Sequence, residues 1–163
     1  MAPSEALARV AAEAQARFGG ALLGVETERG ELTLRVGAGD LLALLEWARG
    51  AGFPMLTDIS GVDGLGLGWQ PRFRVSYHLL GLEQGLRLRV QADTDEDAEG
   101  PVLPTATGLW PLADWNEREV WDLLGIRFAG HPDLRRILLH EDYALGHPLR
   151  KDVPTRGVHD DNR

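Results

Sequence analysis

The sequence predicts an α+β fold of two layers, with helices on one face of a small mixed β-sheet and an extended C-terminal arm. Three observations support this prediction. The first half of the chain alternates segments of helical apolar spacing with short segments of period two. A hairpin with one apolar and one polar face follows them. The last quarter contains repeated X-Pro pairs and no period, which indicates extended chain that cannot build a core alone.

Two helices and two strands are predicted in the N-terminal third. Apolar side chains recur at helical spacing over residues 5–18, and two glycines end that segment. Residues 22–26 and 32–36 are predicted strands, because apolar and polar side chains alternate in the second of them. Asp40 is a suitable N-cap for a second helix over residues 41–49.

Three further strands are predicted in the middle of the chain. Residues 53–60 form the first. In residues 72–79 apolar side chains alternate with arginine, serine and histidine, and residues 86–91 repeat the alternation after a turn. The last two strands therefore form a hairpin with one buried and one solvent-exposed face. The order helix, two strands, helix, three strands is typical of a two-layer α+β domain.

An acidic segment separates this sheet from the C-terminal region. Residues 91–100 carry five carboxylates and no apolar side chain larger than alanine, so we expect a solvated loop. Residues 155–163 show no pattern and are expected to be disordered at their end. The chain is thus divided into an α+β domain over residues 1–113, a signature helix with an extended arm over residues 114–154, and this tail.

A short helix with pronounced end signals opens the C-terminal region. Asn116 is a candidate N-cap, and Glu119 completes a capping box with it. Trp115 and Val120 are placed to form a hydrophobic staple across the cap. Gly125 stands where a left-handed residue ends a helix. A helix of about two turns is not stable alone in water, so its large apolar side chains must pack against another surface.

The segment after this helix is predicted to lie along a protein surface. Its X-Pro pairs favour extended backbone, and it carries too many leucines and isoleucines to be an idle linker. The surface belongs either to its own domain or to a partner. Two basic pairs, Arg135-Arg136 and Arg150-Lys151, suit ion-paired anchors in a protein interface, and Arg and Trp are the types enriched at interface hot spots. The neighbouring tryptophans either join that interface or fill the core.

Length and composition exclude several classes of protein. The 163 residues suffice for one domain with a real core, and no apolar run approaches the ~20 residues of a membrane span. The N-terminus shows no signal-peptide pattern, so we expect no secretion. The chain has no cysteine, which excludes disulfides and thiolate-bound zinc or iron–sulfur clusters. A net charge of −8, concentrated before residue 116, argues against nucleic-acid binding.

Candidate catalytic and metal-binding groups have simpler structural explanations. Glu117, Glu119 and Asp122 could form a set of general acids and bases. The helix dipole favours Glu117 and Glu119 at the N-terminus of the helix, and an i,i+4 ion pair between Arg118 and Asp122 accounts for the third carboxylate, so no catalytic role is needed. The histidines of the last third are nine, seven and twelve residues apart, which does not match a metal site. We expect those before prolines to fix turns by bonding backbone carbonyls. No phosphate-binding loop or nucleophile elbow is present.

Residues 104–154 carry a dense resemblance to a known family. The run from Glu117 through Ile126, the pair His131-Pro132 with the residues after it, and the ending GHPLRKDVP resemble the signature of the 30-kilodalton subunit of respiratory complex I, the subunit designated C in bacterial NADH:quinone oxidoreductases. A looser resemblance covers residues 53–90. The signature residues, which we expect to form a partner interface, are Trp115, Glu117, Arg118, Glu119, Asp122, Gly125, His131, Pro132, Arg135, Arg136, Pro148, Arg150, Lys151 and Asp152.

The resemblance implies a structural subunit of an enzyme complex, without a catalytic centre of its own. It implies that the chain belongs to the peripheral arm of a proton-translocating NADH:quinone oxidoreductase. The chain would lie on the cytoplasmic side of the inner membrane and would be bound to the membrane only through the complex. The implied partners are the 49-kilodalton-like subunit, designated D, and the iron–sulfur subunits designated B and I. NADH, FMN, the iron–sulfur clusters and quinone would be bound by other subunits, and no cofactor by this chain.

Two alternatives remain open at this stage. Membrane-bound hydrogenases and related oxidoreductases use a similar subunit. A more distant alternative is a free-standing metal-dependent hydrolase that uses His131, His140 and Asp142. The family often continues well past the Arg-Lys-Asp-x-Pro stretch, whereas nine residues follow Pro154 here. We therefore expect contacts made by a longer tail to be absent or supplied by another subunit.

Overall fold

The computed structural model describes residues 3–154, so the disorder predicted for residues 155–163 lies outside the described part of the chain. The helices are α1 (Pro3–Phe18), α2 (Leu41–Gly50) and α3 (Ala113–Leu124), with short 3-10 turns η1 (Gly19–Ala21) and η2 (Ala38–Asp40). The strands are β1 (Leu22–Glu28), β2 (Glu31–Gly37), β3 (Met55–Asp63), β4 (Phe73–Gly81), β5 (Leu86–Asp93), β6 (Asp95–Asp97), β7 (Gly100–Pro104) and β8 (Arg127–Ala129).

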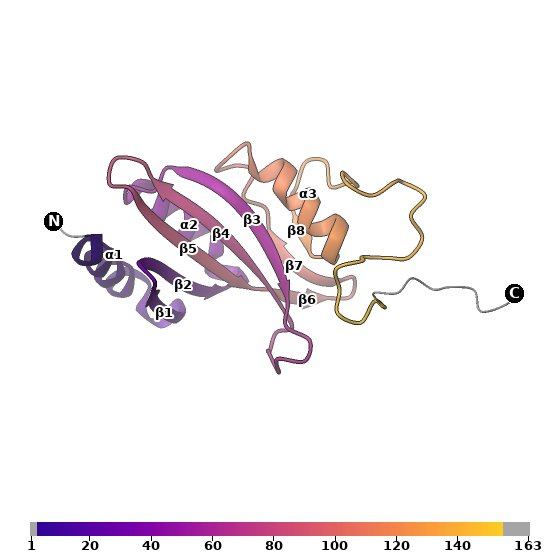
Figure 1. Cartoon of the computed structure of the whole chain (residues 1–163), viewed down its shortest axis with the longest axis horizontal. Helices are drawn as coiled ribbons and strands as arrows, with labels where there is room; N and C mark the ends of the chain where they lie inside the picture. Colours follow the sequence, from indigo (N-terminus) through magenta and orange to yellow (C-terminus); the bar gives the residue numbers. More distant parts are fainter. Residues whose placement is uncertain (1–2, 155–163) are drawn as a thin grey trace, which may run out of the picture.

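The main sheet has five strands in the order β1-β2-β5-β4-β3 (Figure 1). Strands β2 and β5 are parallel and the other neighbours are antiparallel, so the sheet is mixed as predicted. The predicted hairpin is β4–β5, in which Tyr77 lies opposite Val90 and Leu79 opposite Leu88. The alternation of apolar and polar side chains therefore predicted the correct strands and the correct buried face.

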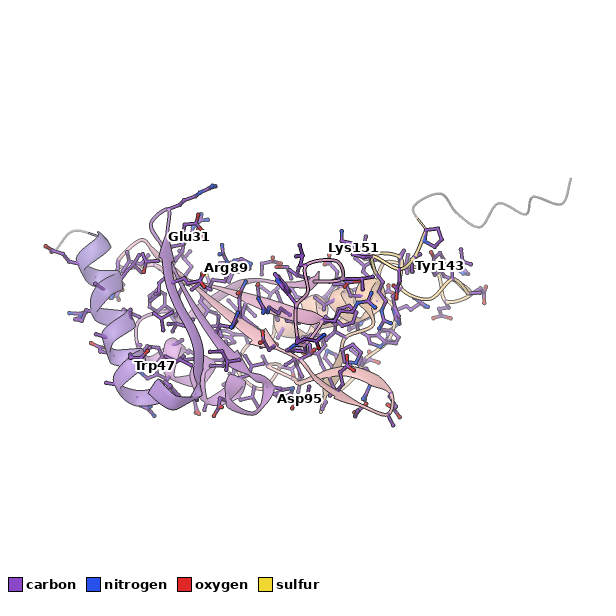
Figure 2. All side chains as sticks on the ribbon, turned by 90° about the horizontal axis from the view of Figure 1, so that it is seen from below. Glu31, Trp47, Arg89, Asp95, Tyr143 and Lys151 are labelled. Carbon is purple, nitrogen blue, oxygen red and sulfur yellow. The ribbon has the colours of Figure 1, made fainter. Side chains whose placement is uncertain are left out.

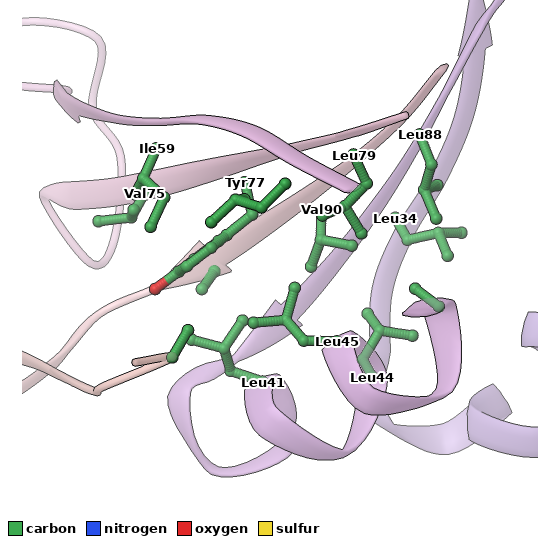
Figure 3. Close-up of a cluster of buried hydrophobic side chains, with 14 of the residues drawn as sticks. Leu34, Leu41, Leu44, Leu45, Ile59, Val75, Tyr77, Leu79, Leu88 and Val90 are labelled. Atoms are coloured by element: carbon green, nitrogen blue, oxygen red, sulfur yellow. The ribbon is translucent and has the colours of Figure 1, made fainter. Parts of the chain in front are cut away.

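The helices cover one face of this sheet. Leu34, Tyr77 and Val90 of the strands point toward a stripe on α2, which consists of Leu41, Leu44, Leu45 and Ala48 (Figure 3). Helix α3 packs on the same face, because a Cβ added at Gly61 of β3 would collide with Leu124. The α+β class with helices on one face of a mixed sheet is thus confirmed.

One predicted strand start and one predicted helix cap were wrong in detail. Strand β3 begins at Met55 rather than at residue 53, because the Phe53 N–H still bonds the Ala48 carbonyl at 3.1 Å and closes α2. Asp40 precedes α2 as predicted, but its side chain makes no capping hydrogen bond. The 3-10 turn η2 leads directly into the helix, and the backbone carbonyl of Ala38 satisfies the Leu41 N–H instead.

A second sheet was missed. Strands β6 and β7 pair antiparallel, and β7 pairs with β8 in parallel. The prediction of a loop over residues 91–100 was therefore wrong, although residues 95–99 are exposed to solvent as predicted. Arginines distant in sequence neutralise its carboxylates: Arg74 lies 2.7 Å from the buried Asp93, and Arg127 of β8 binds Asp97. Acidic side chains that meet such partners can enter a folded layer, which a sequence pattern cannot reveal.

The chain from residue 130 to 154 contains neither helix nor strand and runs beside α3 at one end of the molecule (Figure 1). We call this segment the arm. Figure 2 places Tyr143 of the arm and Trp47 of α2 toward opposite ends of the molecule. Among the described residues, no helix is both long and apolar enough to span a bilayer.

Candidate functional site

Helix α3 carries the first five signature residues and begins earlier than predicted. Its first residue is Ala113, and no side chain caps it. The predicted capping box and hydrophobic staple at Asn116 were therefore wrong. The turn before the helix continues into it, since the N–H groups of Ala113 and Asp114 bond the carbonyls of Trp110 and Pro111. Trp115 consequently lies in the first turn, with 64% of its surface exposed.

The end of α3 agrees with the prediction. Gly125 adopts a left-handed conformation with φ of 72°, and its N–H bonds the Trp121 carbonyl at 2.8 Å. A Cβ at this position would lie 2.5 Å from the imidazole Cδ2 of His147, so the arm packs directly on the helix end. Glycine is needed here for both its φ and its small size.

Asp122 is the main anchor of the arm. Its side chain is fully buried and accepts hydrogen bonds from three consecutive backbone N–H groups, those of Ile137, Leu138 and Leu139, at 3.2, 2.9 and 2.9 Å. The Arg136 guanidinium adds an ion pair at 2.6 Å. Burial raises the pKa of the Asp122 carboxyl, but these donors together outweigh burial and lower it. The ion pair predicted between Arg118 and Asp122 was wrong.

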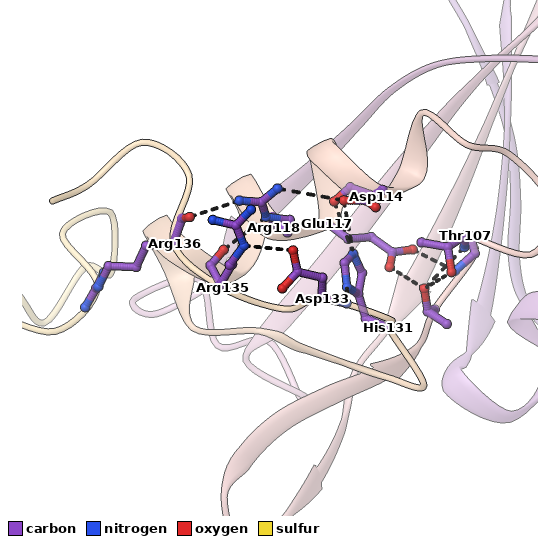
Figure 4. Close-up of polar contacts among 10 residues, drawn as sticks. Thr107, Asp114, Glu117, Arg118, His131, Asp133, Arg135 and Arg136 are labelled. Carbon is purple, nitrogen blue, oxygen red and sulfur yellow. Dashed lines mark hydrogen bonds and ion pairs between the residues drawn. The ribbon is translucent and has the colours of Figure 1, made fainter. Parts of the chain in front are cut away.

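Arg118 binds the same part of the arm through backbone carbonyl groups. Its guanidinium donates to the backbone carbonyls of Arg135 and Arg136 at 3.2 and 3.0 Å and lies 3.9 Å from the Asp114 carboxylate (Figure 4). Only 9% of the side chain is exposed. Arg118 and Asp122 therefore bind the carbonyls and N–H groups of one short stretch of the arm, which fixes its path along α3.

The histidines before prolines fix turns, as predicted. His131 Nε2 lies 3.1 Å from the Asp114 carbonyl, while its Nδ1 accepts the Asp133 N–H at 3.0 Å (Figure 4). His147 Nδ1 lies 2.9 Å from the Asp122 carbonyl, and its ring packs edge-on against Trp121. Both rings thus tie the arm to α3 through backbone carbonyls.

The end of the arm binds the main sheet. The Arg150 guanidinium donates to the Leu124 carbonyl at 2.7 Å and lies over the Phe73 ring. The Lys151 N–H bonds the carboxylate of Asp63 at 2.8 Å. Arg72 joins the two parts: it pairs with Asp63 and lies 3.0 Å from Asp152. Hydrogen bonding from Arg72 holds the pKa of Asp63 well below its usual range.

Glu117 faces the opposite way, into the body of the domain. It is fully buried, and it accepts hydrogen bonds from the Thr105 hydroxyl at 2.5 Å and the Ala106 N–H at 2.6 Å. Burial raises its pKa to about 7, against the effect of these two donors. The buried hydroxyl of Tyr77 also has its pKa raised, by burial and by Glu117.

The remaining signature residues are exposed, except for Pro148, which is partly buried. Trp115, Glu119, Pro132, Arg135, Lys151 and Asp152 are exposed, and Arg135 forms an ion pair with the nearby Asp133. Exposed apolar side chains accompany them, namely Leu138, Leu145 and Leu149. Trp110, by contrast, is buried and donates its indole N–H to the Pro54 carbonyl. The arm therefore has an inner polar side bound to α3 and an outer side open to solvent.

The structure offers little support for a metal site. Between residues 3 and 154, no three His, Cys, Asp or Glu side chains are grouped so as to hold a metal ion. His140 and Asp142 are 3.3 Å apart on the exposed arm, whereas the His131 ring contacts the Asp114 carbonyl and the Asp133 N–H.

Three contributors to the site were missed from the sequence. Asp63 and Arg72 hold the end of the arm, and Thr105 binds Glu117. Asp63 lies in the segment LTDISGVD, where the looser resemblance to the family was visible, but nothing in that segment indicates a bond to residue 151. Contacts across 88 residues depend on the tertiary fold.

Comparison with known proteins agrees with this geometry. Residues 34–159 match the family described as respiratory-chain NADH dehydrogenase, 30 Kd subunit. In Rhizobium etli (strain CIAT 652), the NADH-quinone oxidoreductase subunit designated C 1 is 48% identical over 161 residues, covering 94% of this chain and 76% of the relative. The corresponding subunit of Aromatoleum aromaticum is 43% identical over 162 residues, covering 94% and 79%.

Solved structures share the fold. A trypsin-resistant fragment of Nqo5 superposes with a TM-score of 0.68 at 36% identity and covers 79% of this chain and 99% of the fragment. A chain of the membrane-bound sulfane sulfur reductase, an archaeal respiratory membrane complex, gives a TM-score of 0.69 at 22% identity, covering 91% and 85%, and shows the fold alone. With the family match over most of its length, the chain belongs to the family of the 30 Kd subunit of respiratory-chain NADH dehydrogenase.

Proposed function

We propose that the chain is a structural subunit of the peripheral arm of a proton-translocating NADH:quinone oxidoreductase. The observation that supports this most strongly is the family match combined with the arm of this chain, residues 130–154. This segment of about 25 residues has neither helix nor strand, and α3 holds it in one path. A segment so well anchored on its inner side, with Arg135 and several leucines exposed on its outer side and Trp115 exposed on α3, is suited to contact a partner protein.

The proposed partners are the 49-kilodalton-like subunit and the two iron–sulfur subunits of the same complex. Without cysteine the chain has no thiolate ligands for iron–sulfur clusters, so the clusters are assigned to other subunits. The NADH, FMN and quinone sites are assigned to other subunits because the family resemblance implies it. Its contribution would be to hold their geometry. The proposed location is the cytoplasmic side of the inner membrane, reached through the complex.

An equivalent subunit of a related membrane complex is the second candidate. The shared fold with a chain of the sulfane sulfur reductase keeps this possibility open, but it concerns architecture only. The family match and the relatives at 43–48% identity favour the NADH:quinone enzyme.

Purification of the tagged chain from gently solubilised membranes tests the proposal. We expect the 49-kilodalton-like subunit and the iron–sulfur subunits in the eluate by mass spectrometry, together with NADH:quinone activity. Recovery of hydrogenase or sulfur-reductase subunits would favour the second candidate. A chain that elutes alone would contradict both.

A further inference from the structure

Glu117 differs from the other buried carboxylates of residues 3–154, because no cation lies beside it. Asp63, Asp93 and Asp122 each form an ion pair with an arginine, at 2.5, 2.7 and 2.6 Å. Glu117 is as fully buried as Asp122, yet within the described chain it forms no ion pair and accepts hydrogen bonds from neutral donors. Burial penalises a carboxylate that lacks a compensating charge, so the protonated form is favoured.

The residues around Glu117 do not supply this charge. The guanidinium of Arg118 is directed away from it and donates to carbonyls of the arm (Figure 4). The His131 Nδ1 accepts a backbone N–H and therefore carries no proton. Tyr77 of β4 is a neutral phenol, and the negative charge of Asp114 on α3 raises the pKa of Glu117 beyond the effect of burial. Its titratable neighbours are thus engaged elsewhere, neutral or negative.

Two threonine hydroxyls allow Glu117 to exist with or without a proton. In the ionised form, the Thr105 hydroxyl donates to Glu117 Oε2 at 2.5 Å, and its oxygen accepts the Thr107 N–H at 3.2 Å. In the protonated form, Glu117 Oε2 donates across the same distance, and the Thr105 hydroxyl turns to Thr107 Oγ1 at 3.0 Å. Thr107 is only half-buried, so these hydroxyls lead from the buried carboxyl toward solvent. A proton bound by Glu117 can therefore exchange with water.

Asp114 connects this carboxyl to the arm. Its carboxylate lies 3.9 Å from the Arg118 guanidinium, and its backbone carbonyl lies 3.1 Å from Nε2 of His131. Glu117 follows Asp114 at i+3 on the same helix, so an ionised Glu117 places a second negative charge next to the first. Like charges at this spacing repel. The repulsion acts on the first turns of α3, where Arg118 and His131 attach the arm.

We propose that Glu117 is a proton-binding site that couples the pH to the attachment of the arm on α3. With the proton bound, the site holds no buried charge, and α3 stays closed on the segment after β7. Loss of the proton favours an opened form in which water reaches the carboxylate, and Arg118 and His131 release the arm. This inference goes beyond the proposed function, because it concerns the chain itself and not the complex that the chain joins.

Carbon-13 NMR of the full chain tests the proton-binding site. The side-chain carboxyl signal of Glu117 is assigned through its covalent connection to the backbone and followed as the pH is raised. We expect a midpoint at about 7, against the ordinary glutamate value of 4.5. A midpoint near 4.5 would overturn the inference, because the folded chain would then hold no proton there at neutral pH.

Hydrogen exchange of the same chain tests the coupling to the arm. Protection factors at pH 6 and pH 8 are compared, which removes the intrinsic effect of pH on exchange. The reporters are the arm amides of Ile137, Leu138 and Leu139, which bond the Asp122 carboxylate. If the opened form contains an ordinary glutamate, linkage makes opening about tenfold more frequent at pH 8 than at pH 6. We expect the protection of these amides to fall by that factor.

The variant Glu117→Gln tests whether this carboxyl causes the effect. An amide can donate to Thr105 and accept the Ala106 N–H, so the variant mimics the protonated form. Its arm amides should change by less than about twofold between the two pH values. The exposed Glu119→Gln is the matched control and should keep the tenfold fall. A fall that persists in Glu117→Gln would assign the effect to another group and overturn the inference.

The amides of the β4–β5 hairpin distinguish opening of the arm from unfolding of the whole domain. They lie in the centre of the main sheet and should exchange only by global unfolding. We expect the arm amides to exchange faster than these and still to depend on pH. Arm amides that exchange faster without any dependence on pH, or only as slowly as the hairpin, would overturn the coupling, because the arm would then open without Glu117 or only with the entire domain.

Discussion

At the residue scale, the arm depends most on Asp122. A buried carboxylate is costly unless several donors satisfy it, and here three N–H groups and the guanidinium of Arg136 do so. The same side chain therefore specifies the local path of the arm. Removing its charge would remove the ion pair with Arg136 and leave three N–H groups with a weaker acceptor.

We predict that Asp122→Asn lowers the free energy of unfolding by about 3 kcal/mol, the typical cost of breaking a buried ion pair. Because the pKa of Asp122 is lowered in the folded chain, the stability it provides is present above its ordinary value of 3.8 and is lost as the pH falls through the lower folded value. Urea denaturation at pH 7 and at low pH measures both effects. Asp142→Asn, on the exposed part of the arm, is the control and should have no effect.

Glu117 has the opposite dependence on pH. Its pKa is raised from 4.5 to about 7 in the folded chain, mainly by burial. The stability associated with it is therefore fully present below pH 4.5 and is lost as the pH rises to about 7, by about 3 kcal/mol in total. Glu117→Gln should flatten this part of the pH–stability profile. An unchanged slope would contradict the prediction, and the exposed Glu119→Gln is the matched control.

At the element scale, α3 connects the body to the arm. Val120 and Leu124 are buried in the core, Glu117 binds the segment after β7, and Arg118 and Asp122 hold the arm. One helix of 12 residues thus presents three chemically different faces.

The left-handed end of α3 gives a test at this scale. Gly125→Ala would strain a φ of 72° and press a methyl group against His147. Gly66→Ala has the same kind of strain, at φ of 86°, but its Cβ would meet open space. The backbone strain costs roughly 1–2 kcal/mol in each case. We expect Gly125→Ala to lower the melting temperature clearly more than Gly66→Ala does, and equal changes would contradict the packing of the arm on the helix end.

The sequence predicted those elements whose pattern is local. The β4–β5 hairpin and the stripe of α2 follow from periodicity, and Gly125 follows from its conformational freedom. Predictions failed where groups outside the recognised pattern satisfy a hydrogen bond or neutralise a charge. The Asn116 cap is unnecessary because the preceding turn supplies carbonyls, and the acidic residues 91–100 enter a sheet because Arg74 and Arg127 neutralise them.

At the scale of the whole molecule, the family resemblance identified the residues of the site but not their partners. Asp122 meets residues 137–139 and Asp63 meets residue 151 only after the fold is complete. We infer that the polar groups of the inner side shape the arm and that the outer side contacts other subunits. The molecule then acts as a rigid body with a preformed docking segment.

Hydrogen–deuterium exchange of the free chain and of the assembled complex tests this central claim most directly. Ile137, Leu138 and Leu139 bond Asp122, so their amides should exchange slowly in both states. The outer part of the arm, including the exposed Leu145, should exchange quickly in the free chain and at least about tenfold more slowly in the complex. Unchanged exchange over residues 140–149 on assembly would contradict the account, because the arm would then contact no partner.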